Sequence, residues 1–518
     1  MQPLDFPARF NAAEYFVDRA VKERGWGGRV AFRCRGRDVT YQQTLEMVNH
    51  AAGALLGIGL RSEQRVLLAL HDSLEFVAAF WGAIKAGIIP VPVHTLIGPE
   101  ELRYYLDDSG AAAFIVHSDI AERLRPALPP RTVLAGDGSE FEQRITAAMP
   151  VSLAAHTHAD DMAFWQYTSG STGKPKAAVH LQRDMVYGAE LYAIPIQQLT
   201  PEDRIYSASK MFFAYGLGNS LYCPMRAGAA TVLVPEKSTP EVCLGTISEQ
   251  RPTVFYAVPT LFAAILNMPE DARFDTSSLR LAVSAGEALP AEIYRRFKER
   301  FGVEIIDGIG STEMVHVFIS NRPGEVRPGS SGKAVPGYKA RIVDEQGHDV
   351  KPGETGSLLV SGGSAAAFYW RKAAATRRTM LGEWLATGDK YRQDADGYYW
   401  YCGRADDMMK VGAQWVSPVE VEAALLEHPA VLECAVTTVT GGDSMEHPRA
   451  FVVLREVATG ATPTGPTAPT EDELRTFLRE RIAHHKVPHS FQFVAGLYKT
   501  PTGKIQRYRL RAEGSASL

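Results

Sequence analysis

Short β-branched apolar runs alternate with segments of helical length over roughly the first 400 residues of this chain. This alternation predicts an α/β fold with largely parallel sheets, because a parallel neighbour needs a long crossover connection. Several of the runs end in Gly- or Ser-rich turns, and open α/β sheets bind ligands at such strand ends. The runs are RVLLAL (65–70), AAFIVHS (112–118), ATVLVP (230–235), TVFYAVP (253–259), LRLAVSAG (279–286) and VEIIDGIG (303–310).

The pattern changes between residues 340 and 402, where period-2 segments are separated by Gly and Asp turns. Such alternation predicts a small antiparallel region. A smaller α+β unit follows, so we expect an N-terminal domain over residues 1–405 and a C-terminal domain over residues 406–518. Residues 456–470 are rich in Pro, Thr and Gly and are predicted to form a surface loop. The expected C-terminal elements are a helix in VEVEAALLEHP, strands in ECAVTTV and RAFVVLR, and a helix in EDELRTFLRERIAHH.

The overall charge is mildly acidic, at −4, which favours neither nucleic acid nor an anionic membrane as a partner. The longest apolar stretch, residues 76–93, is interrupted by Lys85, Gly87 and Pro90, so it predicts helix, turn and strand rather than a membrane span. The five cysteines are scattered without a CxxC pair, which argues against a zinc site and a disulfide framework. No secretory signal is visible, and we expect a cytoplasmic protein.

The strongest local motif is YTSGSTGKPK, residues 167–176. Small hydroxyl residues interleaved with glycines let backbone N–H groups approach phosphate oxygens closely, and Lys174 and Lys176 supply positive charge. It is not a Walker A motif, because Pro175 follows Lys174 and Thr168 stands where the first Gly belongs. The alternative, a flexible Ser/Gly surface loop, is disfavoured by the two lysines and by the apolar strand that precedes them.

This motif resembles the phosphate loop of the adenylate-forming superfamily, which includes acyl-CoA synthetases and aryl-CoA ligases. The resemblance continues in order through FFAYG (212–216), SAGEALP (284–290), GIGSTEM (308–314), TGD (387–389), GRADDMMK (403–410) and PTGKIQR (501–507), and so covers nearly the whole chain. The segments around 210–219 and 308–316 particularly resemble the benzoate–CoA ligase branch. The resemblance implies a ligase that uses ATP, Mg²⁺ and coenzyme A, and that forms an acyl-adenylate before the thioester.

The resemblance also implies roles for individual residues. Lys504 is the expected catalytic cation for adenylation, Thr312 is expected to contact phosphate, and Glu313 is the expected Mg²⁺ ligand. Asp389 is expected to accept the ribose hydroxyls, with Arg404 nearby. The nucleotide-binding residues are predicted to be Thr168, Ser169, Gly170, Ser171, Thr172, Gly173, Lys176, Ser284, Ala285, Gly286, Glu287, Asp307, Gly308, Asp389 and Arg404.

In family members the C-terminal domain rotates between an adenylating and a thioester-forming arrangement. The resemblance places the hinge at Asp406 and the coenzyme A tunnel at Lys410, Gly412 and Ala413. The chain departs from the family pattern at Ala413 and at Ala177, where glycine is usual. Neither departure removes a catalytic group.

The resemblance implies that the acid is benzoate or a substituted benzoate, and small and flat side chains could form a slot that fits a planar ring. His316 has two alternative roles, contact with a ring substituent or structural packing. Alternative functions are delivery to a carrier-protein thiol, a fatty acyl-CoA synthetase, and a non-catalytic nucleotide-binding module. The sequence is silent on oligomeric state, although homodimers are common in the family. The predicted acyl pocket comprises Phe213, Ala214, Tyr215, Ala285, Gly286, Ile309, Gly310 and His316.

Overall fold

A computed structural model describes residues 4–168, 174–269, 274–411, 414–440, 446–455, 469–499 and 505–516. Its largest sheet has nine strands in the order β15-β14-β13-β12-β11-β9-β10-β1-β2, and neighbours from β13 to β1 run parallel. The strands are β1 (Val30–Cys34), β2 (Arg37–Thr40), β9 (Arg204–Ser207), β10 (Ala230–Leu233), β11 (Val254–Ala257), β12 (Leu281–Ser284), β13 (Ile305–Gly310), β14 (Val317–Ser320) and β15 (Lys333–Ala334).

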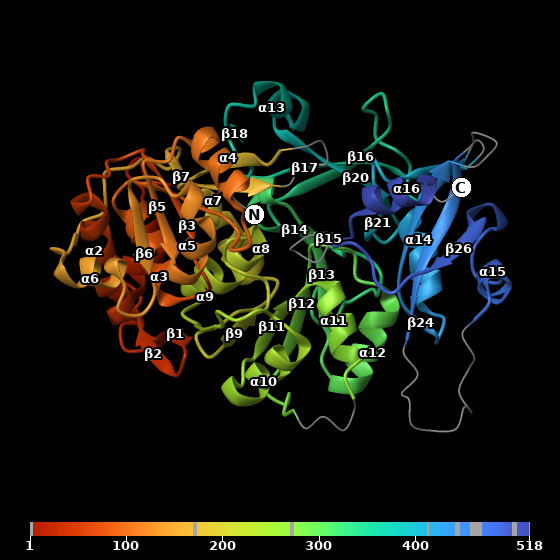
Figure 1. The fold of residues 1–518 in the computed structure, drawn as a ribbon, viewed down its shortest axis with the longest axis horizontal. Coiled ribbons are helices and arrows are strands. Elements are labelled where there is room, and N and C mark those ends of the chain that lie inside the picture. The colour runs from red at the N-terminus through yellow and green to blue at the C-terminus, as the bar shows by residue number, and fades with distance from the viewer. Residues whose placement is uncertain are drawn as a thin grey trace.

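A second, four-stranded parallel sheet has the order β4-β3-β5-β6 and lies beside the large sheet (Figure 1). One apolar core joins them, since Phe32 and Tyr256 of the large sheet and Val66 and Ile115 of the smaller one belong to a single buried cluster. Both sheets therefore confirm the predicted α/β class. The strands are β3 (Arg65–Ala69), β4 (Ile89–Pro92), β5 (Ala113–His117) and β6 (Thr132–Ala135).

Helices flank these sheets, and several begin at a capping side chain. Thr40 and Gln43 form a capping box at the start of α2, and Ser73 accepts from Phe76 N at the start of α3. The helices up to residue 301 are α1 (Arg19–Lys22), α2 (Tyr41–Gly57), α3 (Leu74–Lys85), α4 (Pro99–Ser109), α5 (Ser118–Leu124), α6 (Glu140–Ala147), α7 (Asp184–Gly188), α8 (Ala214–Leu217), α9 (Cys223–Ala227), α10 (Pro240–Gln250), α11 (Pro259–Leu266) and α12 (Ala291–Phe301). None of the described helices is long and apolar enough to cross a membrane.

Two antiparallel sheets accompany the α/β part. A three-stranded sheet has the order β18-β8-β7, and a five-stranded sheet contains β16, β17, β19, β20 and β21. The five-stranded sheet, within residues 339–404, confirms the predicted antiparallel region, whereas the three-stranded sheet contains a hairpin at residues 162–181, earlier in the chain than that prediction. Their bounds are β7 (Met162–Thr168), β8 (Lys176–Leu181), β16 (Lys339–Val343), β17 (Gly356–Ser361), β18 (Phe368–Tyr369), β19 (Met380–Leu381), β20 (Trp384–Gln393) and β21 (Tyr399–Arg404), with α13 (Ala373–Thr379) beside them.

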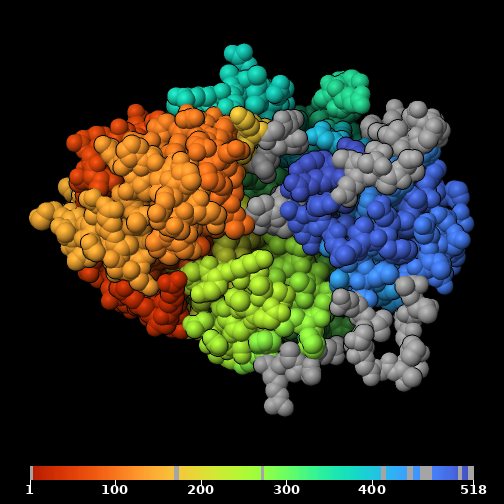
Figure 2. Space-filling view, viewed as in Figure 1, coloured from red at the N-terminus to blue at the C-terminus, as the bar shows by residue number. Residues whose placement is uncertain are grey.

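The C-terminal residues form their own sheet, β24-β25-β26, with a separate apolar core. Figure 2 shows these blue residues adjoining the green surface of the large domain, and there Arg455 donates to Asn267 Oδ1. The elements are β22 (Met409–Val411), β23 (Gln414–Val416), α14 (Pro418–Leu426), β24 (Val431–Thr440), β25 (Glu446–Leu454), α15 (Glu471–Arg479), β26 (Ser490–Phe493) and α16 (Arg507–Ala516).

One expected helix is shorter than its sequence pattern suggests. The pattern predicts a helix through His485, but α15 ends at Arg479 and a separate turn spans His484–Lys486. Leu478 O accepts from both Arg481 N and Ile482 N, which tightens and closes the last turn. The predicted surface loop lies mainly outside the described residues, since 456–468 are not among them.

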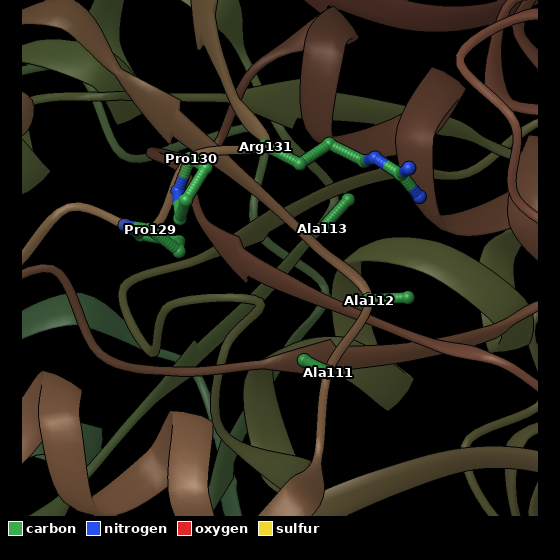
Figure 3. Close-up of a pocket in the computed structure, with 6 residues that line it drawn as sticks. All are labelled: Ala111, Ala112, Ala113, Pro129, Pro130 and Arg131. Carbon is green, nitrogen blue, oxygen red and sulfur yellow. The ribbon is translucent and has the colours of Figure 1, made fainter.

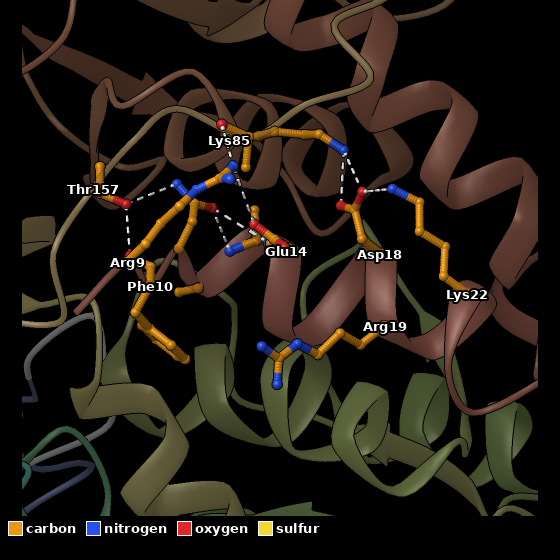
Figure 4. A network of polar contacts seen from close by, with 12 residues as sticks. Arg9, Phe10, Glu14, Asp18, Arg19, Lys22, Lys85 and Thr157 are labelled. Atoms are coloured by element: carbon orange, nitrogen blue, oxygen red, sulfur yellow. Dashed lines mark hydrogen bonds and ion pairs between the residues drawn. The ribbon is translucent and has the colours of Figure 1, made fainter. Parts of the chain in front are cut away.

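A buried ion pair fixes the N-terminal segment against α3 (Figure 4). Lys85 is fully buried, and its ammonium lies 2.9 and 2.7 Å from the two oxygens of Asp18. Lys22 reaches Asp18 Oδ1 at 2.8 Å, but more than half of the Lys22 side chain is exposed. Removing one partner of a buried pair leaves a charge without compensation. Loss of Lys85 should therefore lower the free energy of unfolding more than loss of Lys22.

We expect Lys85→Met to lower the free energy of unfolding by about 3 kcal/mol, because it leaves the buried Asp18 carboxylate without its main partner. Lys22→Ala breaks an exposed pair and should cost less than about 1 kcal/mol. The double variant Asp18→Asn/Lys85→Met should recover much of the loss, since no buried charge remains. Thermal melts of the three variants test this, and equal Tm losses for Lys85→Met and Lys22→Ala would contradict it.

Candidate active site

The predicted phosphate loop joins two strands of an antiparallel hairpin. Thr168, the last residue of β7, lies opposite Lys176, the first residue of β8. Beside the loop, Tyr104 OH donates to Pro175 O at 2.5 Å, and Lys174 Nζ lies 5.3 Å from the centre of the Tyr104 ring. The described ends of the loop are therefore anchored. The remaining predicted loop residues, Ser169, Gly170, Ser171, Thr172 and Gly173, lie outside the described residues.

Lys176 and Glu313 both contact Tyr369. The Tyr369 hydroxyl donates to Glu313 Oε1 at 2.6 Å, and Lys176 Nζ lies 4.9 Å from the centre of the Tyr369 ring. Thr312 and Glu313 belong to a short 3₁₀ turn, η5 (Thr312–Met314). The structure thus brings the predicted phosphate cation and the predicted metal carboxylate together from distant parts of the sequence. A carboxylate beside a threonine hydroxyl is a set of oxygen ligands that suits Mg²⁺.

The predicted adenine segments end two neighbouring parallel strands. Ser284 in β12 lies opposite Asp307 in β13, and both side chains are buried. Gly286, in the turn that also contains Ala285 and Glu287, has φ +95°, a backbone conformation that favours glycine. A Cβ atom at Gly308 would lie 2.7 Å from Ile319 O, so a larger residue would displace β14.

Replacing Asp307 by Asn should remove part of the pH dependence of stability. Burial raises the pKa of the Asp307 carboxyl to about 8, from an ordinary value of 3.8. Between these two values the native state holds a proton that the unfolded chain releases, so this carboxyl makes folding less favourable as pH rises. Between these pKa values, Asp307 lowers the free energy of unfolding by up to about 1.4 kcal/mol per pH unit, and this decrease stops above about pH 8.

The Tm of Asp307→Asn minus that of the wild type should therefore increase from about pH 5.5 to about pH 8 and then level off, because an amide does not ionise. Thermal melts in a buffer series measure this difference. A difference in Tm between the two proteins that stays constant over the whole buffer series would contradict the raised pKa.

Asp389 and Arg404 face each other across β20 and β21. Arg404 Nη1 donates to Asp389 Oδ1 at 3.0 Å and to Thr387 O at 2.9 Å. Gly388 has φ +77°, and a Cβ atom there would lie 2.8 Å from Arg404 Nη2. The TGD motif thus needs glycine for both its backbone conformation and its close contact with the guanidinium.

The predicted acyl segment packs against the strand that leads to the adenine segment. Tyr215 OH donates to Val283 O at 3.0 Å, so α8 is tied to β12 just before Ser284. A Cβ atom at Gly216 would lie 2.1 Å from Lys210 O, which excludes any larger residue at that position. Phe213, Ala214, Ile309 and Gly310 are partly exposed, as residues that line a substrate pocket would be, whereas Ala285 is buried.

His316 is packed among three tyrosine rings. The ring centres of Tyr192, Tyr215 and Tyr222 lie 5.3, 6.1 and 6.1 Å from that of His316. His316 Nε2 bonds Asn219 Oδ1 at 3.1 Å, and burial lowers the His316 pKa to about 3, so the imidazole is neutral. These contacts favour the packing role, and contact with a ring substituent stays a prediction.

Residues on the two sides of the predicted hinge contact different parts of the chain. Ala405 N donates to Gly388 O of β20, at 3.0 Å. Asp407 instead lies 3.8 Å from Arg507 Nη1 and 3.6 Å from Arg511 Nη2 of the C-terminal helix. Asp406 is exposed between them. Lys410 lies in β22, while Gly412, Ala413 and Lys504 lie outside the described residues.

Three candidate residues have contacts that the sequence analysis missed. Tyr369 bonds Glu313, His180 bonds Thr312 O, and Asp184 bonds His180. Their only signal is position, because Tyr369 ends a short FY strand and His180 follows the phosphate loop in β8. The contacts of Tyr369 and His180 to η5 are long-range, so periodicity and local motifs could not indicate them, whereas His180 and Asp184 are only four residues apart.

Two other features are separate from this site. A hollow of about 510 Å³ lies at the amino ends of β5 and β6, lined by residues from Ala111 to Ala113 and from Pro129 to Arg131 (Figure 3). Parallel sheets bind ligands at the opposite, carboxyl ends of their strands. At those ends, Asp119 bonds His71 at 3.0 Å and His117 at 2.6 Å. Hydrogen bonds within the described residues thus join His71, His117 and Asp119 to one another.

Comparison with known proteins agrees with this geometry. Residues 17–370 match the family described as AMP-binding enzyme, and residues 420–504 match the AMP-binding enzyme C-terminal domain. The chain belongs to the AMP-binding enzyme family. It is 41% identical to the benzoate–CoA ligase of Thauera aromatica over 98% of this chain and 97% of that protein. This likeness supports the predicted benzoate–CoA ligase branch.

Solved structures share both the fold and the sequence. A benzoate CoA ligase from Burkholderia xenovorans LB400 superposes with a TM-score of 0.89 and 42% identity, covering 97% of this chain and 100% of that chain. The anthranilate CoA ligase AuaEII, in complex with anthranoyl-AMP, superposes with a TM-score of 0.93 and 41% identity, covering 100% and 99%. The similarity therefore extends over both the large domain and the C-terminal sheet.

Proposed function

We propose that this chain is an AMP-forming acid–thiol ligase that converts benzoate or a small substituted benzoate to its coenzyme A thioester. ATP and coenzyme A are the co-substrates of CoA ligases in this family. The observation that supports the proposal most directly is the bond from Tyr215 OH to Val283 O, which ties the segment we assign to the acid to the strand that leads to the segment we assign to adenine. An acid and a nucleotide held by these two segments would meet at the end of β12.

The first step joins the acid to AMP. A carboxylate oxygen attacks the α-phosphorus of ATP, the bond to the β-phosphate oxygen breaks, and pyrophosphate leaves. Negative charge crowds around the phosphorus, so the site must supply cations and alignment rather than a base. We assign Lys176 and Thr312 to the phosphates, Asp389 to the ribose hydroxyls, and Lys504 to the carboxylate and α-phosphate.

Glu313 is the residue that would hold Mg²⁺. Its side chain is oriented by Tyr369, and Mg²⁺ commonly takes one or two protein carboxylates and completes its shell with phosphate oxygens and water. When bound, the ion offsets negative charge on the phosphates. Glu313 and Thr312 would therefore align the leaving group, while Lys176 lies over the Tyr369 ring.

The second step transfers the acyl group to the coenzyme A thiol and releases AMP. In our proposal the C-terminal domain, residues 406–518, turns about Asp406 against residues 1–405 between the two steps. The contacts support a break there, because Ala405 N bonds Gly388 O of β20, whereas the Asp407 carboxylate forms ion pairs with Arg507 and Arg511 of α16. The turn would withdraw Lys504 and bring Lys410, Gly412 and Ala413 to the pantetheine chain.

The surroundings of the acyl segment favour a compact aromatic acid. Ala214 leaves room, whereas the neighbouring Tyr215 is held in place by its hydroxyl contact. Phe213, Ala214 and Tyr215 are partly exposed, so this segment offers aromatic and small walls. Such walls suit a planar ring, because aromatic rings meet edge to face or offset.

We expect benzoate or a hydroxy-, amino- or halobenzoate to give a kcat/KM at least about tenfold above that of hexanoate or decanoate, a difference that one or two well-placed pocket contacts supply. Thioester formation with coenzyme A across this panel is the measurement. A fatty acid that exceeds every benzoate would refute the aryl assignment. If the enzyme formed aroyl-AMP but no coenzyme A thioester, and a thioester appeared only after a carrier protein was added, the carrier alternative would be correct.

A further inference from the structure

The turn that contains Glu313 ends in a strained backbone conformation. Val315 has φ +67° and ψ −43°, and His316 N donates to Met314 O at 2.7 Å, which together define a γ-turn. Positive φ is unfavourable for a β-branched residue, and this form of γ-turn is uncommon. A strained segment persists only where the surrounding structure holds it, so the contacts around η5 determine the position of Glu313.

Three carbonyl oxygens of this segment accept hydrogen bonds from side chains. Thr312 O bonds His180 Nε2 at 2.8 Å, Met314 O accepts from Ser364 Oγ at 2.8 Å, and Val315 O accepts from Tyr222 OH at 3.3 Å. The contact to Thr312 O is adjacent to Glu313 in the chain. His180 therefore holds the segment next to both of its predicted catalytic side chains.

His180 is itself held by Asp184. Both residues are fully buried, and His180 Nδ1 lies 3.0 Å from Asp184 Oδ2, which also accepts from Leu181 N at 2.9 Å. The Phe164 ring stacks on the imidazole with ring centres 4.9 Å apart. Because Nε2 faces a carbonyl oxygen, it must donate its proton, and Asp184 fixes the ring that does so.

The same strand also carries Lys176. In a strand, residues two and four apart share a face, so Lys176 and His180 of β8 lie on one side of the hairpin. Lys176 contacts Tyr369, which bonds Glu313, and His180 bonds Thr312 O. Strand β8 thus connects to η5 at two points, one through Tyr369 and one through His180.

The geometry points to a positioning role for His180 and Asp184: the pair sets the place of Thr312 and Glu313 relative to the phosphate hairpin. This role rests on the proposed function, because it concerns the adenylation half-reaction. Neither side chain is assigned contact with substrate. The pair acts through the Thr312 carbonyl, and a misplacement of η5 should slow the step that uses phosphate and metal contacts.

His180→Phe tests this role, because it keeps the stacked ring and removes both hydrogen bonds. We expect benzoyl-AMP formation from benzoate, ATP and Mg²⁺ to slow by roughly 10- to 100-fold. The Mg²⁺ concentration for half-maximal rate should rise, while thioester formation from supplied benzoyl-AMP stays within about twofold of wild type. His180→Gln can still donate near Thr312 O and should recover part of the rate. Asp184→Asn keeps the side-chain shape and should give a smaller loss of the same kind.

Thr157→Val is the matched control. Thr157 Oγ1 is buried, donates to Phe10 O at 2.7 Å and accepts from Asn11 Nδ2 at 3.2 Å, so this variant also removes buried side-chain bonds, but to the N-terminal segment rather than to η5 (Figure 4). It should leave both half-reactions and the Mg²⁺ dependence near wild type. Equal losses in the two half-reactions of His180→Phe and Asp184→Asn, or no loss in either, would overturn the positioning role. A wild type that is inert with every benzoate would instead overturn the proposed function.

Discussion

Lys504→Ala should slow formation of the acyl-adenylate by about 100- to 1,000-fold, the usual effect of removing one group that stabilises charge in a transition state. The carboxylate and the α-phosphate are both anionic, and they approach each other as pyrophosphate leaves. A lysine ammonium between them offsets this charge, whereas a methyl group does not. Thioester formation from supplied benzoyl-AMP should stay within a few-fold of wild type, because that step starts from a mixed anhydride in which the carboxylate charge is already removed.

The measurement is two separate half-reactions, benzoate-dependent pyrophosphate exchange and the reaction of benzoyl-AMP with coenzyme A. Lys499→Ala is a suitable control, since it removes a lysine five positions earlier that pairs with Glu433 Oε1 at 2.6 Å. Lys499 also forms a backbone bridge with Ile505, so it shares the local structure next to Lys504. Equal loss of both half-reactions in Lys504→Ala, or an equal effect of Lys499→Ala, would refute the assignment.

The strands of the α/β part are predictable because each is a short apolar run between turn residues. RVLLAL contains β3 and TVFYAVP contains β11, within one or two residues at each end. The order of the strands is not predictable in this way. Strand β1, near the N-terminus, pairs with β10, and β9 lies between β10 and β11. Periodicity indicates which face of a strand is buried but not which strand becomes its neighbour.

Candidate site residues are recognisable from sequence where the motif is local. Glu313 and Asp389 each lie in a short run with glycine. Asp389 lies beside Arg404, and Glu313 contacts Tyr369, which also contacts Lys176. Tyr369 and His180 could not be found in this way, since their contacts to η5 cross between sheets. Val315 is the opposite case, because local propensity argues against its positive φ and only tertiary contacts hold it.

Glu313→Gln should slow adenylation by about 100- to 1,000-fold, because an amide keeps the shape of the side chain but loses the charge that Mg²⁺ requires. Tyr369 OH donates to Glu313 Oε1 at 2.6 Å, and an amide oxygen can still accept this bond, so the fold of η5 should survive. The half-reaction from benzoyl-AMP needs neither pyrophosphate nor its metal and should stay near wild type.

Tyr369→Phe separates the charge of Glu313 from its orientation. It removes only the 2.6 Å hydrogen bond, so the carboxylate remains but is less well placed, and we expect a loss of about tenfold. Titration with Mg²⁺ distinguishes the two variants: high Mg²⁺ should restore much of the rate of Tyr369→Phe, whereas Glu313→Gln should remain slow at every concentration. If Glu313→Gln reached the wild-type rate at high Mg²⁺, the metal would be held by other groups and Glu313 would have no essential part in the step.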